Sequence, residues 1–242
     1  MAANWINTCD GSPQTPTNVS RGVFGATLNA QQQLDVLTRS INAVTNFTGK
    51  KPKGYTAPLW ATSKELIPQL QDAGILYDHS FMHHDVQPYW APDTLAFSWV
   101  ETNVANSASS WMMPMTTMKP SKVVELLLIP SNWHLDDWPP LNPIPDMGWA
   151  QGYVDTHSVE RLWKEQFDFA YREYDEFIFP MSIHPQVSGK PQVIMMHERI
   201  IEHINKHPGV EWMTLSGMAE EFVAGRIAGA NIEGGVDPSA RI

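Results

Sequence analysis

The chain has 242 residues, of which 43% are hydrophobic and 17% are charged, and its formal net charge at pH 7 is −10. This charge argues against nucleic acid as a partner, because phosphate backbones are bound by clusters of Lys and Arg. The single cysteine, Cys9, excludes an intramolecular disulfide. The sequence shows neither a secretory signal nor a run of about 20 apolar residues, so we expect a cytoplasmic protein without a membrane partner.

Residues 1–27 contain Asn, Thr, Ser, Gly and Pro without apolar periodicity, which predicts an irregular or disordered arm. From residue 28 onward, helical apolar spacing alternates with short apolar runs typical of strands. The Gly-rich segment 225–242 is expected to be a loose tail. In chain order, we predict a helix over 29–48, strand 52–58, helix 62–73, strand 75–78, a hairpin around 95–100, strand 123–129, helix 158–174, strand 177–183, helix 193–204, strand 210–215 and helix 216–224.

Capping residues predict several helix ends. Gly49 is expected to end the first helix, since glycine readily adopts the left-handed conformation of a C-cap. Thr62 and Glu65 form a capping-box pattern, although Pro68 removes a helical donor and conflicts with a helix that starts there. Ser158 is the expected N-cap of the helix that follows it.

The alternation of helices and strands predicts an α/β domain over residues 28–224, with a largely parallel sheet. Residues 123–129 are almost continuously apolar, which is typical of a strand covered on both faces. The apolar run 177–183 ends at His184-Pro185. A histidine at the end of such a strand can exchange protons near neutral pH. The alternative is a histidine that only forms hydrogen bonds within a loop.

Five stretches occur in the order in which one enzyme family carries its motifs. They are Thr48–Pro58 (TGKKPKGYTAP), Leu70–Ser80 (LQDAGILYDHS), Asp85–Tyr89 (DVQPY), Trp133–Pro139 (WHLDDWP), and Ile183–Pro185 (IHP) with Gly189–Pro191 (GKP). Through these stretches the chain resembles the polysaccharide deacetylase family, the NodB-homology domain of carbohydrate esterase family 4. The likeness is to its allantoinase-like and peptidoglycan-deacetylase-like branch.

The resemblance implies a distorted (β/α) barrel of seven strands that hydrolyses a non-peptide amide C–N bond. In metal-dependent members, an Asp and an H-[S/T]-x-x-H pair hold a divalent cation such as zinc, a second carboxylate is the general base, and the closing-motif histidine is the acid. The strands that carry the cation precede the position of helix 29–48, where this chain has only the arm. We therefore expect an incomplete, N-terminally truncated barrel without assigned metal ligands, and the cofactor stays unknown.

Two histidine pairs have the spacing of metal ligands. His79 and His83 match H-[S/T]-x-x-H literally, but they follow the GYTAP stretch instead of preceding it, which favours a coincidence. The alternative is a zinc-type site formed together with 84–85 at a strand end. His203 and His207 lie at the end of a predicted helix, where interaction with the helix dipole is favoured over metal binding.

For the active site, we assign His184 as acid or base and Asp85 as its nearest charged partner, with a turn-forming role as the alternative for Asp85. Asp136-Asp137 is a carboxylate pair, for which a solvated loop pair is favoured over split pKa values. Substrate-binding residues are expected to be Asp137 together with loop aromatics, whose alternative is plain packing. These aromatics are Trp60, Tyr89, Trp133 and Trp138.

The leading hypothesis is a hydrolase that acts on an N-acetylated sugar or a small cyclic amide. The alternative is a catalytically inactive binding or assembly module, or a fragment that needs a partner chain. Missing barrel strands would leave a sheet edge and apolar surface exposed, which favours association of the chain into a homo-oligomer.

Overall fold

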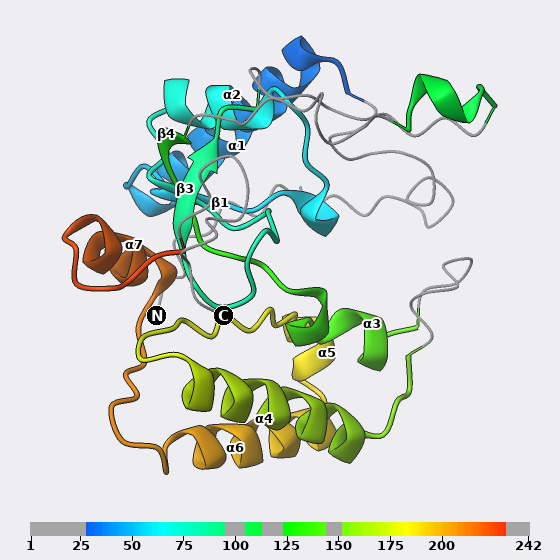
Figure 1. Cartoon of the computed structure of the whole chain (residues 1–242), viewed down its shortest axis with the longest axis vertical. Coiled ribbons are helices and arrows are strands. Elements are labelled where there is room, and N and C mark those ends of the chain that lie inside the picture. The colour runs from blue at the N-terminus through cyan, green and yellow to red at the C-terminus, as the bar shows by residue number, and fades with distance from the viewer. Residues whose placement is uncertain (1–27, 95–104, 113–122, 144–151, 231–242) are drawn as a thin grey trace.

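The computed structural model describes residues 28–94, 105–112, 123–143 and 152–230 (Figure 1). None of the helices in these ranges is both long and apolar enough to cross a lipid bilayer. The predicted arm, the hairpin around 95–100 and most of the tail lie outside the described residues. The elements are α1 (Ala30–Thr48), β1 (Gly54–Tyr55), η2 (Pro58–Trp60), α2 (Leu66–Asp72), β2 (Tyr77–Asp78), β3 (Tyr89–Pro92), η3 (Ala108–Ser110), β4 (Val123–Leu128), η5 (Trp133–Leu135), α3 (Trp138–Leu141), α4 (Thr156–Glu173), α5 (Pro185–Ser188), α6 (Pro191–Ile204) and α7 (Leu215–Val223).

The described strands form one open sheet in the order β1-β2-β4-β3. β1, β2 and β4 are parallel, and β3 pairs antiparallel with β4. The largely parallel sheet is thus confirmed, with β3 as the exception. Gly54 pairs with Tyr77, and a Cβ atom at residue 54 would overlap the Tyr77 ring, so glycine is required for this approach.

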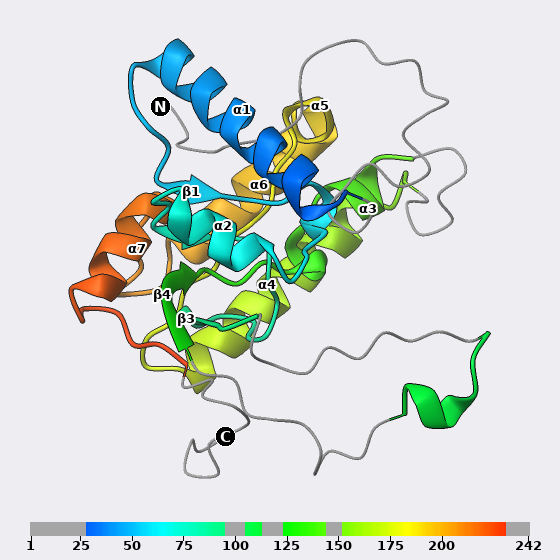
Figure 2. The ribbon, with the colours of Figure 1, turned by 90° about the horizontal axis from the view of Figure 1, so that it is seen from above.

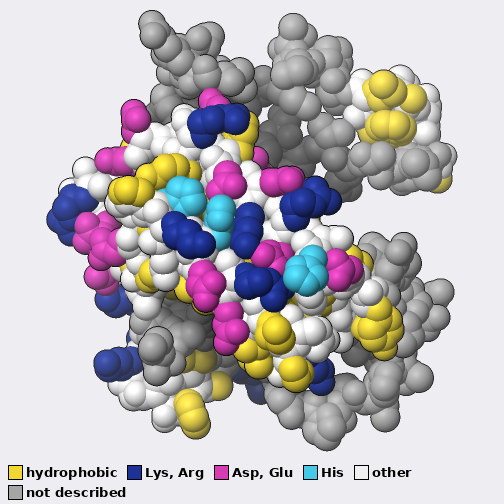
Figure 3. All heavy atoms as spheres, turned by 90° about the horizontal axis from the view of Figure 1, so that it is seen from below, with side chains coloured by type: hydrophobic (Ala, Val, Ile, Leu, Met, Phe, Trp, Pro, Cys, Tyr) yellow, Lys and Arg dark blue, Asp and Glu magenta, His cyan; other side chains and the backbone are white. Residues whose placement is uncertain are grey.

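Helices cover the sheet in layers. α1 and α2 lie at one end of the molecule and α4 and α6 at the other (Figure 1). From above, α1 and α2 are in front of α4 and α6 (Figure 2). α4 and α6 pack on each other through apolar faces that include Trp163, Phe167, Met196 and Ile200. On the face seen from below, acidic, basic and histidine side chains are interspersed (Figure 3).

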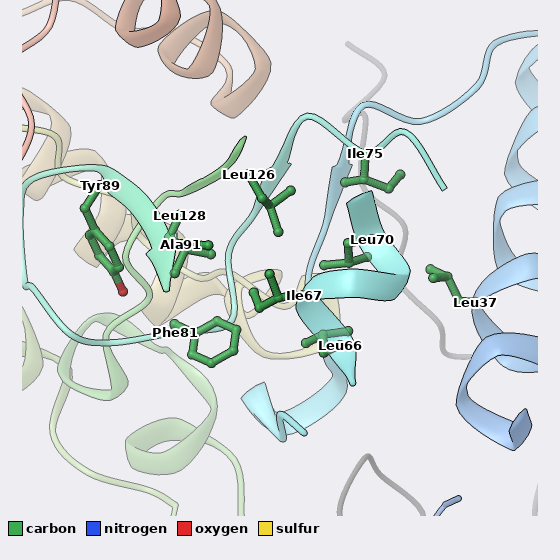
Figure 4. Close-up of a cluster of buried hydrophobic side chains, with 10 residues drawn as sticks. All are labelled: Leu37, Leu66, Ile67, Leu70, Ile75, Phe81, Tyr89, Ala91, Leu126 and Leu128. Atoms are coloured by element: carbon green, nitrogen blue, oxygen red, sulfur yellow. The ribbon is translucent and has the colours of Figure 1, made fainter. Parts of the chain in front are cut away.

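Alternate residues at the end of β4 belong to two different apolar cores. Leu126 and Leu128 join the cluster that α1 and α2 cover (Figure 4). Leu127 and Ile129 instead pack with Tyr77 and with α7. The side chains of these four residues are fully buried. The prediction that this strand is covered on both faces is confirmed, because successive side chains of a strand point to opposite faces.

The predicted first helix is confirmed at both ends. Asn29 accepts a hydrogen bond from the backbone N–H of Gln32, whose side chain accepts from the Asn29 N–H in return, which completes a capping box. Gly49 follows the helix with φ +72°, the left-handed conformation expected of a C-cap.

Two other predicted helix starts are wrong. α2 begins at Leu66 and lacks a side-chain cap, so the Thr62 capping box does not form. Pro68 is then the third helical residue, where the backbone N–H would have no intrahelical acceptor, and its conflict with the helix disappears. The N-cap of α4 is Asp155, whose carboxylate accepts a hydrogen bond from the backbone N–H of Ser158. Ser158 therefore lies inside the first turn of the helix and is not its N-cap.

The strands predicted over 177–183 and 210–215 are also wrong. The first segment is extended and forms only one parallel bridge, between Ser182 and Asp136. Residues of both segments line a groove of about 880 Å³. Their apolar side chains are partly buried against α4, α6 and α7. Apolar spacing therefore predicted burial correctly, whereas a strand also needs a neighbouring backbone to pair with.

Candidate functional site

His184 lies directly before α5, where Pro185 occupies the first helical position. Its ring Nδ1 is 2.6 Å from Oδ1 of Asp137, and its backbone N–H donates to Oδ2 of the same carboxylate at 2.9 Å. Because a carboxylate can only accept, Nδ1 carries the proton in this contact, and Nε2 is the nitrogen left for a substrate. The His184 side chain is 35% exposed, so a substrate can reach it.

Asp137 is completely buried, and donors from two residues hold its carboxylate. Besides His184, the Ser188 hydroxyl donates to Oδ2 at 2.5 Å. Ser188 has a single hydroxyl proton, so its 2.8 Å contact with Nε2 of His197 requires the His197 ring to be the donor. Hydrogen bonds thus run from His197 through Ser188 and Asp137 to His184. We call these four side chains the His184 network.

Sequence reasoning missed Ser188 and His197. Ser188 lies between the two halves of the closing motif, four residues after His184. His197 lies on α6 beside the apolar positions Met196 and Ile200 and is half-buried against the ring of Trp163. The only signal in the sequence was that His197 is a polar residue at the edge of an apolar helix face. This position does not indicate which residue its side chain contacts.

The charges around His184 favour its protonated form. Burial lowers the pKa of His184, but the hydrogen bond and negative charge of Asp137, with a further contribution from Asp136, raise it above its ordinary value overall. Asp136 is itself buried, and burial raises the pKa of its carboxyl; its Oδ1 lies 3.5 Å from the His184 ring and accepts the Trp138 N–H. The two carboxylates therefore shift the titration of His184 toward the protonated form.

These contacts correct three assignments. The partner of His184 is Asp137, not Asp85, which lines a cavity of about 260 Å³ beside α4 together with Glu165 and Gln166. The pair Asp136-Asp137 is buried, not solvated, and both carboxylates face the same ring. Asp137 cannot contact a substrate because it is completely buried. Its carboxylate instead contacts the backbone N–H and the ring of His184.

Loop aromatics lie on both sides of the Asp136-Asp137 pair. Trp133 meets Trp60 edge to face, with ring centroids 4.6 Å apart, and Trp138 meets the His184 ring at 4.7 Å. Leu59 and Trp60 both have positive φ, at +53° and +50°. Non-glycine residues rarely adopt this conformation, which costs about 1 kcal/mol each. The strained turn is the feature that brings Trp60 to Trp133.

Tyr89 does not belong to this aromatic group. Its side chain is completely buried in the core, and its hydroxyl is hydrogen-bonded to the backbone N–H and the ring of His83, at 3.1 and 3.0 Å (Figure 4). The assignment of Tyr89 to substrate binding is wrong. An aromatic residue in a Pro-flanked stretch suggested a loop, whereas Tyr89 begins β3.

The resemblance implies a divalent cation held by an Asp and an H-[S/T]-x-x-H pair, and neither His79 with His83 nor the residues around His184 fit such a site. His79 is buried, its Nδ1 donates to the carbonyl of Ile129 at 2.9 Å, and burial lowers its pKa to about 4. His83 is exposed and its ring contacts the Tyr89 hydroxyl, and neither histidine belongs to a group of three metal-type donors among the described residues. Asp136, Asp137 and His184 also lie close together, but the Asp137 carboxylate is completely buried and already accepts three hydrogen bonds from His184 and Ser188. We therefore derive no chemical step through a metal.

Comparisons with known proteins give close sequence relatives. No family model matches the chain. The chain is 42% identical over 196 residues to "Peptidoglycan deacetylase" of Helicobacter pylori, a match that covers 81% of the chain and 65% of the relative. It is 32% identical over 203 residues to "Peptidoglycan deacetylase-like protein FGM2" of Gibberella zeae, a match that covers 81% of the chain and 59% of the relative. The chain thus spans less than two thirds of the length of these curated relatives.

Solved structures share the fold. A Mycobacterium smegmatis protein described as a polysaccharide deacetylase superposes with TM-score 0.66 at 21% identity, over 85% of this chain and 61% of that one. PuuE allantoinase superposes with TM-score 0.59 at 20% identity, over 81% of this chain and 54% of that one. At such identities the likeness establishes the fold alone. It confirms the predicted distorted (β/α) barrel type, of which the described strands form an open part.

Proposed function

Because the chain belongs to the polysaccharide deacetylase family with its NodB-homology fold, we propose that it hydrolyses a non-peptide C–N bond, the N-acetyl amide of a polysaccharide of the peptidoglycan class. The observation that carries the proposal is the His184 network. A partly exposed imidazole whose far nitrogen is fixed on a buried carboxylate is suited to proton transfer. The exposed side of the ring favours this function over an inactive binding module, because it leaves Nε2 accessible to a substrate.

In the proposed reaction, water adds to the acetyl carbon and the C–N bond breaks. The departing nitrogen must gain a proton, because an amide anion is a poor leaving group. Protonated His184 supplies this proton from Nε2, and Asp137 stabilises the imidazolium through Nδ1. Acetate and a free sugar amine are the products, and the proton released from the added water restores the imidazolium of His184, so that no net proton is taken from the site. The raised pKa of His184 supports this direction of proton transfer at neutral pH.

The purified chain is expected to release acetate from an N-acetylglucosamine oligomer, and a free-amine assay of the same mixture should give an equal amount of product. A cyclic amide such as hydantoin, tested in parallel, distinguishes the two substrate classes. Release from neither substrate would contradict the proposed activity. Acetate without an equivalent amine would point to ester cleavage, which would contradict it as well.

We further propose that Trp60 and Trp133 bind the sugar by stacking. Trp133 is 40% exposed beside Trp60, and a sugar ring presents an apolar face to such a pair. Trp133→Ala is expected to raise KM about tenfold with kcat nearly unchanged, because binding common to ground state and transition state is lost. Trp212→Ala removes a similarly exposed tryptophan from the 208–216 segment and is the control. A fall in kcat without a change in KM would refute the stacking role.

A further inference from the structure

A second cluster of polar side chains lies at the end of the α4–α6 layer, outside the His184 network. Asp168 of α4 meets His203 in the last turn of α6 and His207 just beyond it. Asp168 Oδ1 lies 2.6 Å from Nε2 of His203 and 3.9 Å from Nε2 of His207. Three candidate ligand atoms, one from each side chain, lie within 4.8 Å of one another. They come from two helices, so their meeting is a tertiary feature and not only the i,i+4 spacing of the histidines.

The His207 ring is already oriented for a ligand shared with Asp168. His207 Nδ1 donates to the backbone carbonyl of His203 at 3.0 Å, which fixes the tautomer and leaves the Nε2 lone pair on the side of Asp168. Metal-bound histidines characteristically donate their second ring N–H to such an acceptor. Phe167 and Tyr171 pack against the His207 ring at centroid distances of 5.0 and 4.7 Å. Little side-chain order would have to be gained on binding.

The surroundings favour a cation. Both histidines lie at the C-terminal end of α6, where the helix dipole is negative, and Asp168 adds a carboxylate. The chain as a whole carries a formal charge of −10. Two imidazoles with one carboxylate suit Zn²⁺ and related transition metals, whereas Mg²⁺ and Ca²⁺ require mainly oxygen ligands.

We propose that Asp168, His203 and His207 form a binding site for one zinc-class divalent cation, which would join the end of α6 to α4. In the metal-free form, Nε2 of His203 donates its proton to the Asp168 carboxylate; on binding, this nitrogen would release the proton to solvent, and the ion would take its place between the two atoms. His203 lies six residues after His197 on α6, roughly 9 Å along the helix axis. The site is therefore distinct from the His184 network and does not depend on the proposed hydrolysis.

Isothermal titration of the full chain with ZnCl₂ tests the proposal, with Co²⁺ absorption as a second measurement, because tetrahedral Co²⁺ has intense visible bands. We expect His203→Gln and His207→Gln each to weaken Zn²⁺ binding by at least about tenfold and to abolish the Co²⁺ bands. His157→Gln is the control, since His157 lies on α4 and is 73% exposed. Circular dichroism verifies that each variant is folded.

Two results would overturn the site. One is the absence of Zn²⁺ binding by the wild-type chain. The other is binding whose affinity is the same in the wild type and in both glutamine variants, which would place the ion elsewhere. Loss of zinc binding with acetate release retained would support this site and leave the proposed function standing.

Discussion

Replacing Asp137 with asparagine is expected to lower kcat for acetate release by about 10³-fold while KM changes little, the range typical for loss of an oriented acid or base. The asparagine side chain would still fill the space. Its amide would offer an N–H or a neutral oxygen to Nδ1 of His184, in place of the carboxylate that now accepts at 2.6 Å. The ring would lose both its fixed tautomer and the charge that stabilises the imidazolium.

A measurement independent of turnover accompanies this variant. The pKa of His184, followed through its ring Cε1–H resonance, is expected to fall in Asp137→Asn, because the Asp137 hydrogen bond and charge raise it in the wild type. An unchanged His184 titration would contradict the assigned network.

Asp85→Asn decides between the two carboxylates. Asp85 lies in the cavity beside α4, so its removal should leave the pKa of His184 unchanged. The value of kcat should change by no more than about threefold. A larger loss of kcat in Asp85→Asn than in Asp137→Asn would restore Asp85 as the catalytic partner.

Local features of the sequence predicted the parts of the fold that depend on a single segment. The helix 29–48 carries its own caps, and the residues around Leu127 are apolar enough to require two covered faces. His184 was recognised because an apolar run ends there in His-Pro. In each case the deciding interactions lie within a few residues, so that spacing alone is informative.

Features that depend on distant segments could not be predicted in this way. Asp137 lies 47 residues before His184, and the expectation that adjacent carboxylates point apart made it an unattractive partner. Both carboxylates reach the ring because Asp136 lies in the bridge with Ser182 and Asp137 is the N-cap residue of α3 directly after it. The strand predicted over 177–183 was wrong for the same reason. Its apolar pattern indicates burial but does not show whether another strand lies beside it to pair with.

Asp78 is a fully buried carboxyl at the end of β2. It accepts hydrogen bonds from the backbone N–H and hydroxyl of Ser80, at 3.0 and 2.7 Å. Burial raises its pKa from 3.8 to about 7, and the bonds from Ser80 offset this only in part. The folded chain thus binds the Asp78 proton more tightly than the unfolded chain. Its contribution to stability is complete at low pH and is lost as the pH rises from about 4 to 7.

Asp78→Asn should therefore become progressively more stable than the wild type as the pH rises. Asparagine still accepts from Ser80 but cannot ionise, so the difference in free energy of unfolding should grow by on the order of 4 kcal/mol between pH 4 and pH 8. Urea unfolding across this range measures it. Burial lowers the pKa of His79 to about 4, which makes stability fall toward low pH; comparing variant with wild type removes this opposite effect. Asp72→Asn, at an exposed position of α2, is the matched control. If the Asp78→Asn and wild-type curves ran parallel, Asp78 would titrate as an ordinary solvated carboxyl, and its assignment as a buried, protonated group would be wrong.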